Sequence, residues 1–172
     1  MTYHLPVVPQ VQWFEGMLLV PQHFQQANLR LEQLLAFNWK TIVPYHWGVK
    51  TLKIDSLVLS GGLLRVLELE AILPDGTLVL YQAPMEGIPP LELDLAGLKA
   101  ELQNHQQKTI YLAVPEAIEG LSPVVGEWPR YYSLEGTDVR DENLFENVVK
   151  FPRLFPRLSL IAADHPPARY VS

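Results

Sequence analysis

The sequence predicts a mainly β fold with one amphipathic helix near the N-terminus. Fifteen prolines are spread over 172 residues, and proline interrupts helix interiors and central strands, so many short elements are expected. Apolar residues make up 48% of the chain and charged residues 19%, a balance typical of a globular domain. Two tight-turn sequences, Ser60-Gly61-Gly62 and Pro74-Asp75-Gly76, separate three runs typical of strands.

Residues 11–31 are the densest block of apolar and amide side chains. We expect a strand over 13–19, with a bulge or a close backbone approach at Gly16. Pro21 ends this run and fits the first turn of a helix, where its missing N–H costs nothing. From Gln22 the apolar period becomes helical, which predicts a helix over about 22–40. Its predicted apolar stripe consists of Phe24, Ala27, Leu31, Leu34 and Leu35.

A three-stranded meander is predicted over 49–59, 63–73 and 77–81. In its middle strand the alternation assigns one set of residues to the core, with Arg65 as the exception, while Val66, Glu68 and Glu70 share the other face, which is largely for water. The predicted core set is Leu63, Leu67, Leu69, Ala71 and Leu73.

The second half of the chain predicts further short strands. Two Phe-Pro-Arg repeats begin at Phe151 and Phe155, and prolines four residues apart favour an edge strand over a helix. The expected elements are a strand over 91–95, a short helix through Leu98 and Leu102, a central strand over 109–114, a loop over 115–129, and strands over 128–134, 158–163 and 169–171.

Composition excludes several kinds of partner. The net charge is −6 and no basic face is available, so we expect no nucleic-acid partner. There is no cysteine for disulfides, thiol nucleophiles or thiolate metal sites. No apolar run approaches the roughly 20 residues that a membrane span needs, and no signal peptide is apparent, so direct membrane insertion is not expected.

The sequence predicts no catalytic, cofactor-binding or metal-binding residues, and hence not an enzyme. The five histidines lack metal-ligand spacing, and the usual motifs of acyl transfer, phosphoryl transfer and dinucleotide binding are absent. Tryptophan is enriched both in cores and at binding surfaces. Of Trp13, Trp39, Trp47 and Trp128, only Trp13 stands in a segment with more large apolar side chains than one helix and one strand need.

That segment resembles a known family. The run Trp13-x-Glu15-Gly16-Met17-x-Leu19-x-Pro21-Gln22-His23-Phe24-Gln25-Gln26 is similar to a signature of the TssK family, also called ImpJ or VasE, of bacterial type VI secretion baseplate subunits. Trp47-Gly48 before Leu52-x-Ile54-Asp55, and Pro74-Asp75-Gly76-Thr77, agree with it.

The resemblance implies a structural assembly protein. It implies a β-sandwich like the shoulder domain of siphophage receptor-binding proteins. In the TssK family this domain attaches a homotrimer to the wedge subunits TssF and TssG, at the cytoplasmic face of the inner membrane. Residues 1–172 are then one N-terminal domain of a longer chain, without the helical middle part or the C-terminal part that contacts TssL and TssM.

We hypothesise that the block offers an interface to neighbouring subunits, because methionine adapts to irregular surfaces and amides can bond the backbone of an added segment. The alternative is that the block is needed only to fold the domain. A competing function class is a carbohydrate- or receptor-binding β-sandwich of a phage-tail-like particle. The residues predicted to form the interface with neighbouring subunits are Trp13, Met17, Leu19, Pro21, Gln22, His23, Phe24, Gln25 and Gln26.

Overall fold

The computed structural model describes residues 7–98, 107–118, 120–143 and 148–172. The chain divides into two compact units. The first comprises Met1–Gly48 and Ile72–Leu78, and the second comprises Val49–Ala71 and Val79–Ser172.

The first unit contains the predicted helix, α1, over Pro21–Ile42. Pro21 occupies its first position as expected, and the Val43 N–H closes the last turn on the Trp39 carbonyl at 2.9 Å. The prediction of a strand over 13–19 was wrong. The chain turns there instead, since Gly16 has a φ of 78° and the Met17 N–H donates to the Phe14 carbonyl at 3.3 Å.

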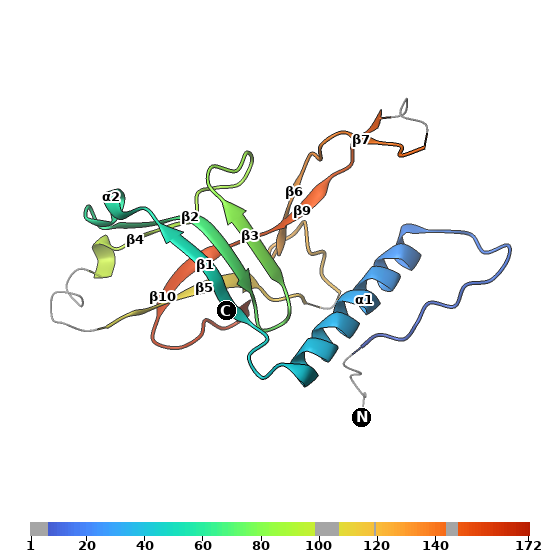
Figure 1. Ribbon diagram of the computed structural model, residues 1–172, viewed down its shortest axis with the longest axis horizontal. Coiled ribbons are helices and arrows are strands. Elements are labelled where there is room, and N and C mark those ends of the chain that lie inside the picture. The colour runs from blue at the N-terminus through green and yellow to red at the C-terminus, as the bar shows by residue number, and fades with distance from the viewer. Residues whose placement is uncertain (1–6, 99–106, 119, 144–147) are drawn as a thin grey trace. The chain divides into compact units, whose positions relative to one another are not determined.

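The larger sheet has the strand order β1-β2-β3, with β4 also paired to β2 (Figure 1). Its strands are β1 (Gly48–Ile54), β2 (Leu63–Ile72), β3 (Leu78–Gln82) and β4 (Glu92–Asp94). The first strand was predicted to run to residue 59, but it ends at Ile54. The Asp55 carboxylate accepts the Leu57 N–H at 3.0 Å and so begins a single helical turn, α2 (Ser56–Leu59).

A bulge in β2 changes which side chains reach the core. The Val66 N–H donates to the Leu91 carbonyl. The carbonyl of the following residue, Leu67, accepts the Ala83 N–H. Both bonds lie on the side away from β1, whereas successive residues of a regular strand bond to opposite sides. The bulge therefore shifts the alternation by one residue.

The predicted core set of β2 was consequently correct only after the bulge. Leu69, Ala71 and Leu73 are buried, but Leu63 and Leu67 are only half-buried. Val66, which was predicted on the water-facing side, is buried in their place. Arg65 is no exception to a pattern, because before the bulge it shares the outer face with Glu92, to which it pairs at 2.9 Å.

The remaining strands form one further sheet and two ribbons. As predicted for a central strand, β5 (Thr109–Pro115) pairs antiparallel with both β10 (Ser159–Ala163) and β11 (Tyr170–Val171). Strand β6 (Tyr131–Leu134) pairs with β9 (Arg153–Pro156), and β7 (Val139–Arg140) with β8 (Val148–Val149). A 3₁₀ turn, η1, covers Ala96–Leu98, and the helix predicted to continue to Leu102 lies outside the described residues.

The Phe-Pro-Arg repeats fall on or beside β9, as predicted for an edge strand. The Arg153 guanidinium lies 4.3 Å from the centre of the Phe151 ring, and that of Arg157 lies 4.1 Å from the centre of the Tyr132 ring. Arg157 also donates to the Tyr131 carbonyl at 3.2 Å. The repeated arginines thus pack against aromatic rings of the ribbon.

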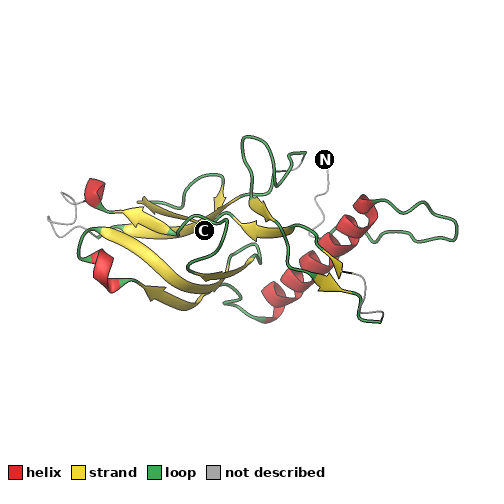
Figure 2. Ribbon diagram, turned by 90° about the horizontal axis from the view of Figure 1, so that it is seen from above, coloured by secondary structure: helices red, strands yellow, loops and turns green. Residues whose placement is uncertain are grey.

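The core lies in the β-rich part of the chain, whose strands stack in two layers when seen from above (Figure 2). Both sheets contribute to it. Its buried apolar residues are Val66, Leu69, Ala71, Leu73, Val79, Tyr81, Leu91, Ala113 and Val114. Tyr81 also bonds within it, because its hydroxyl accepts the Leu91 N–H at 3.0 Å. Among the described helices, α1 included, none combines the length and apolar content needed to cross a bilayer.

Truncating a core side chain after the bulge tests this assignment. Leu69 is 2% exposed, and Leu69→Ala is expected to lower the free energy of unfolding by about 2 to 5 kcal/mol because it leaves a cavity. Leu57 is 85% exposed, so the matched Leu57→Ala should change that free energy by less than about 0.5 kcal/mol. Urea denaturation measures both, and equal effects would contradict the assigned core.

Candidate functional site

The segment before α1 runs back along the helix and is fastened to it at two places. The Val8 N–H donates to Gln33 Oε1 at 2.7 Å, and Arg30 donates to the Val8 carbonyl at 2.5 Å. Nearer the helix start, the Trp13 ring lies 5.9 Å from that of His23 and 6.1 Å from that of Phe24. Residues 9–20, which connect Val8 to the start of α1 at Pro21, form a loop that extends beyond the N-terminal end of the helix (Figure 1).

His23 organises the first turn of α1. The residue before Pro21, Val20, has no side chain that can cap a helix, and its own N–H donates to His23 Nδ1 at 3.2 Å. In return the His23 N–H donates to the Val20 carbonyl at 3.1 Å. Glutamate or glutamine usually makes this reciprocal contact from the third helical position, and here histidine does so. His23 Nδ1 must be unprotonated to accept the bond.

The structure brings three of the nine predicted interface residues into direct contact, namely Trp13, His23 and Phe24. Met17 and His23 are half-buried. The other seven are exposed: Trp13, Leu19, Pro21, Gln22, Phe24, Gln25 and Gln26. The prediction omitted Phe14 and Leu18, which are also exposed, Leu18 to 82%.

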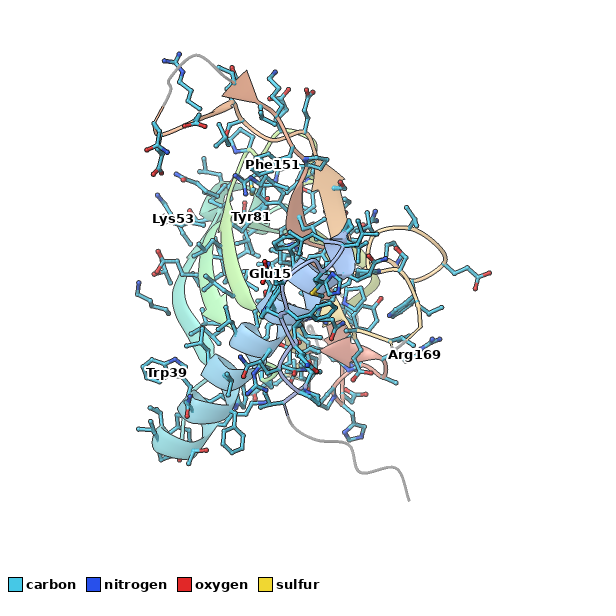
Figure 3. The ribbon with its side chains drawn as sticks, turned by 90° about the vertical axis from the view of Figure 1, so that its right-hand side faces the viewer. Glu15, Trp39, Lys53, Tyr81, Phe151 and Arg169 are labelled. Atoms are coloured by element: carbon cyan, nitrogen blue, oxygen red, sulfur yellow. The ribbon has the colours of Figure 1, made fainter. Side chains whose placement is uncertain are left out.

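An apolar stripe runs along α1, and apart from Phe24 its residues were not predicted as an interface. Its residues follow one another at steps of seven, four, four and three, so they lie on one side of the helix, and all are exposed. They are Phe24, Leu31, Leu35, Trp39 and Ile42. Figure 3 shows Trp39 projecting outward from α1. The helical period was visible in the sequence, but a periodic pattern does not state what covers the stripe, and only Phe24 of these residues was predicted to lie at an interface.

The β2–β3 turn contacts α1 within the same unit. Gly76 has a φ of 95°, and a side chain added there would bring its Cβ within 3.1 Å of Ala36 Cβ. The Leu73 carbonyl accepts the Gly76 N–H at 2.8 Å, and Asp75 Oδ1 accepts the Thr77 N–H at 2.9 Å. Glycine is therefore required both for the turn and for its close approach to the helix.

The histidines and tryptophans outside this block were expected to have structural roles, and the structure describes some of them. The described residues contain no group of three or more His, Asp or Glu placed to hold a metal. Trp128 packs edge-on against Tyr170 at 5.2 Å and beneath the guanidinium of Arg169 at 5.0 Å. His46 has both ring nitrogens buried without a hydrogen-bond partner among the described residues, while His4 and His105 lie outside them.

The electrostatic perturbations are those of surface ion pairs. Lys50 lies 2.6 Å from Glu70, and their hydrogen bond lowers the pKa of the Glu70 carboxyl and raises that of the Lys50 ammonium. The hydrogen bond from Lys108 at 2.8 Å likewise lowers the pKa of Asp164. Each shift favours the charged forms that the pair already has near neutral pH, so neither pair has the features of an acid–base catalyst.

A family sequence profile and a curated relative both match most of the chain. The profile described as Bacterial Type VI secretion, VC_A0110, EvfL, ImpJ, VasE matches residues 23–171. The type VI secretion system baseplate component TssK1 of Pseudomonas aeruginosa is 32% identical over 139 residues, which cover 78% of this chain. The chain spans 29% of that relative's length.

Solved structures share the fold. A crystal structure of TssK superposes with a TM-score of 0.76 and 27% identity, over 95% of this chain and 36% of that chain. A chain of a TssK-TssF-TssG baseplate subcomplex, determined by cryo-electron microscopy, gives a TM-score of 0.74 and 23% identity, over 95% of this chain and 53% of that one. At that lower identity the likeness establishes the fold alone.

The helix-start contact predicts how position 23 tolerates substitution. His23→Ala removes the acceptor of the Val20 N–H and is expected to lower the free energy of unfolding by about 0.5 to 1.5 kcal/mol. His23→Gln keeps an acceptor that reaches the same N–H and should restore most of the loss. Urea denaturation gives the free energies, and hydrogen exchange should be faster at Val20 in His23→Ala only. Equal exchange in both variants would contradict the contact.

Proposed function

The chain belongs to the bacterial type VI secretion family of ImpJ and VasE, the TssK family, and from that premise we propose that it is the N-terminal domain of a structural baseplate subunit. One observation carries the proposal: α1 and the loop before it expose large apolar side chains, and α1 has no buried residue. An amphipathic helix derives most of its stability from packing its apolar side, so we expect this helix to pack against a partner subunit.

The proposed partners of the loop are the wedge proteins TssF and TssG. Support comes from the cryo-electron microscopy subcomplex, which contains both proteins together with a TssK chain of the same fold. Further support comes from the composition of the loop, because aromatic residues and methionine are enriched at interface cores. Trp13, Phe14 and Leu18 provide the apolar area, and Gln22 and Gln25 provide exposed amides beside it.

The stripe along α1 is the proposed surface for self-association into a homotrimer. From Phe24 to Ile42 it covers 19 residues, and the 18 steps between them give about 27 Å at 1.5 Å per residue. Such a ridge has the length over which helices pack in bundles. Its side chains are aliphatic or aromatic throughout, as they are in interfaces between identical subunits.

The proposed location is cytoplasmic, at the inner face of the inner membrane. Contacts with TssL and TssM are assigned to the parts of TssK that extend beyond the length matched by this chain. The proposed role is non-enzymatic: the loop and the stripe bind protein partners, and no substrate is involved.

Replacing Leu18 with aspartate tests the wedge partners. Leu18 is 82% exposed, so Leu18→Asp should leave the free energy of unfolding within about 0.5 kcal/mol of the wild type. A charge at the centre of an apolar interface should weaken co-purification with TssF and TssG at least about tenfold. The matched control is Val125→Asp in the loop before β6, which is 69% exposed and should bind normally. Normal binding by Leu18→Asp would remove the loop from the proposed interface.

Replacing Leu35 with aspartate tests the trimer. The chain has a mass of 19.5 kDa, and light scattering of the wild type should give about three times that value, whereas Leu35→Asp should approach the single-chain mass. Val125→Asp again serves as the control and should keep the trimer. A wild type that is monomeric at all concentrations would contradict the role proposed for the stripe, whatever the outcome with TssF and TssG.

A further inference from the structure

Strand β1 has an unpaired backbone edge. It pairs with β2 on one side, and among the described strands none pairs with its other side. The Asp55 N–H donates to the Arg65 carbonyl of β2, so the residues at even steps back from Asp55 along β1 also face β2. The backbone N–H and C=O groups of Lys50, Leu52 and Ile54 therefore point to the open side.

This edge lacks most of the features that usually prevent strand addition. It is seven residues long, contains no proline, and ends at Ile54, before the capping Asp55. Natural proteins protect open edges with prolines, bulges, short strands or charged side chains, and lysine is a common choice. Strand β1 has only lysines, Lys50 and Lys53.

The two lysines differ in what neutralises them. Lys50 is held by Glu70 at 2.6 Å. Lys53 has no ion pair within the described part of the chain, and Figure 3 shows it at the outer margin of the sheet. An added strand would meet one uncompensated positive charge on a chain whose net charge is −6.

The two faces of β1 present different chemistry beside that edge. Thr51 contacts Glu70 at 3.4 Å on the outer face, and Lys53 shares its parity. Leu52 has the opposite parity, that of the core-facing side, and is nevertheless 52% exposed; Lys50 shares this parity, and its long side chain reaches Glu70 from there. Ile54 lies on the same side and is also exposed. A strand paired to this edge would therefore set one row of side chains near Lys53 and the other row beside Leu52 and Ile54.

We propose that β1 is a strand-addition site for an extended segment of a partner protein in which carboxylate side chains alternate with apolar ones. The backbone of that segment would bond to the outward groups of Lys50, Leu52 and Ile54, its carboxylates would pair with Lys53, and its apolar side chains would cover Leu52 and Ile54. Main-chain hydrogen bonds provide affinity in this mode of recognition, and alternate side chains provide specificity.

A second copy of the same strand is the less suitable occupant. Pairing β1 with β1 would bring the lysines of the two copies to one edge, and like charges facing each other across a pair of strands are unfavourable. An acidic segment removes the same charge that opposes self-pairing. This assignment concerns an edge of the β-rich unit and is independent of the loop and the stripe.

A labelled nine-residue peptide that alternates valine and glutamate provides the probe, and fluorescence anisotropy measures its binding to the whole chain. The matched peptide, with lysine in place of glutamate, should bind at least about tenfold more weakly. Lys53→Glu should reverse that preference. Methylating alternate backbone nitrogens of the acidic peptide, on the side that pairs with β1, should abolish its binding.

Leu52→Pro tests the edge itself. The Leu52 N–H points away from β2, so proline there removes no bond within the sheet, and proline is accepted on edge strands. Binding of the acidic peptide should be lost while the free energy of unfolding stays near that of the wild type; if this variant does not fold, the reversal by Lys53→Glu decides. Absence of binding at about 1 mM peptide, equal binding of the two peptides, or undiminished binding by folded Leu52→Pro would each overturn the proposal.

Discussion

The hydrogen bonds that Val66 and Leu67 make to the same side of β2 determine which residues the larger sheet buries. Because of this bulge, Val66 and Leu69 share the core face although their positions differ by three. The same shift places Arg65 and Glu70 on the outer face, where each has an ion-pair partner. A regular strand would have buried Arg65 or exposed half of the aliphatic residues. The outer chemistry of β1 depends on the same arrangement, because Thr51 meets Glu70 there.

The first unit is built on a different principle. Of the described residues that are buried, only Leu73 belongs to it, and α1 has none. Its internal contacts include polar bonds and ring contacts, such as those of Val8 with Gln33 and of Trp13 with His23. These contacts order the loop and fix the start of the helix, but they cover little of its apolar surface. Association with a partner would bury that surface, which is the physical reason for proposing an assembly role for this unit.

The sequence predicted well those elements that local chemistry determines. Proline fixed the start of α1, and glycine-containing turns separated the strands of the meander. The strands predicted over 109–114 and 158–163, the first from its apolar composition, likewise correspond to β5 and β10. It failed where an element depends on a neighbour: residues 13–19 have the composition of a strand but bond within a turn instead. The bulge was not predicted, because it depends on two partners distant in the sequence. Leu91 bonds to Val66 and Ala83 bonds to Leu67 on the same side of β2.

The same limit applies to the candidate surfaces, because a helical or strand period shows which side chains lie together and not whether protein or water covers them. The stripe through Leu35 therefore has the same sequence pattern as a core helix. Exposure separates the two cases, and chemistry then separates the surfaces from one another. The loop offers large side chains beside amides, the stripe is almost wholly apolar, and the β1 edge offers backbone groups beside Lys53. Because affinity at these surfaces depends on different interactions, a charge placed at Leu18, at Leu35 or at Lys53 affects a different binding event, and the three assignments can fail independently.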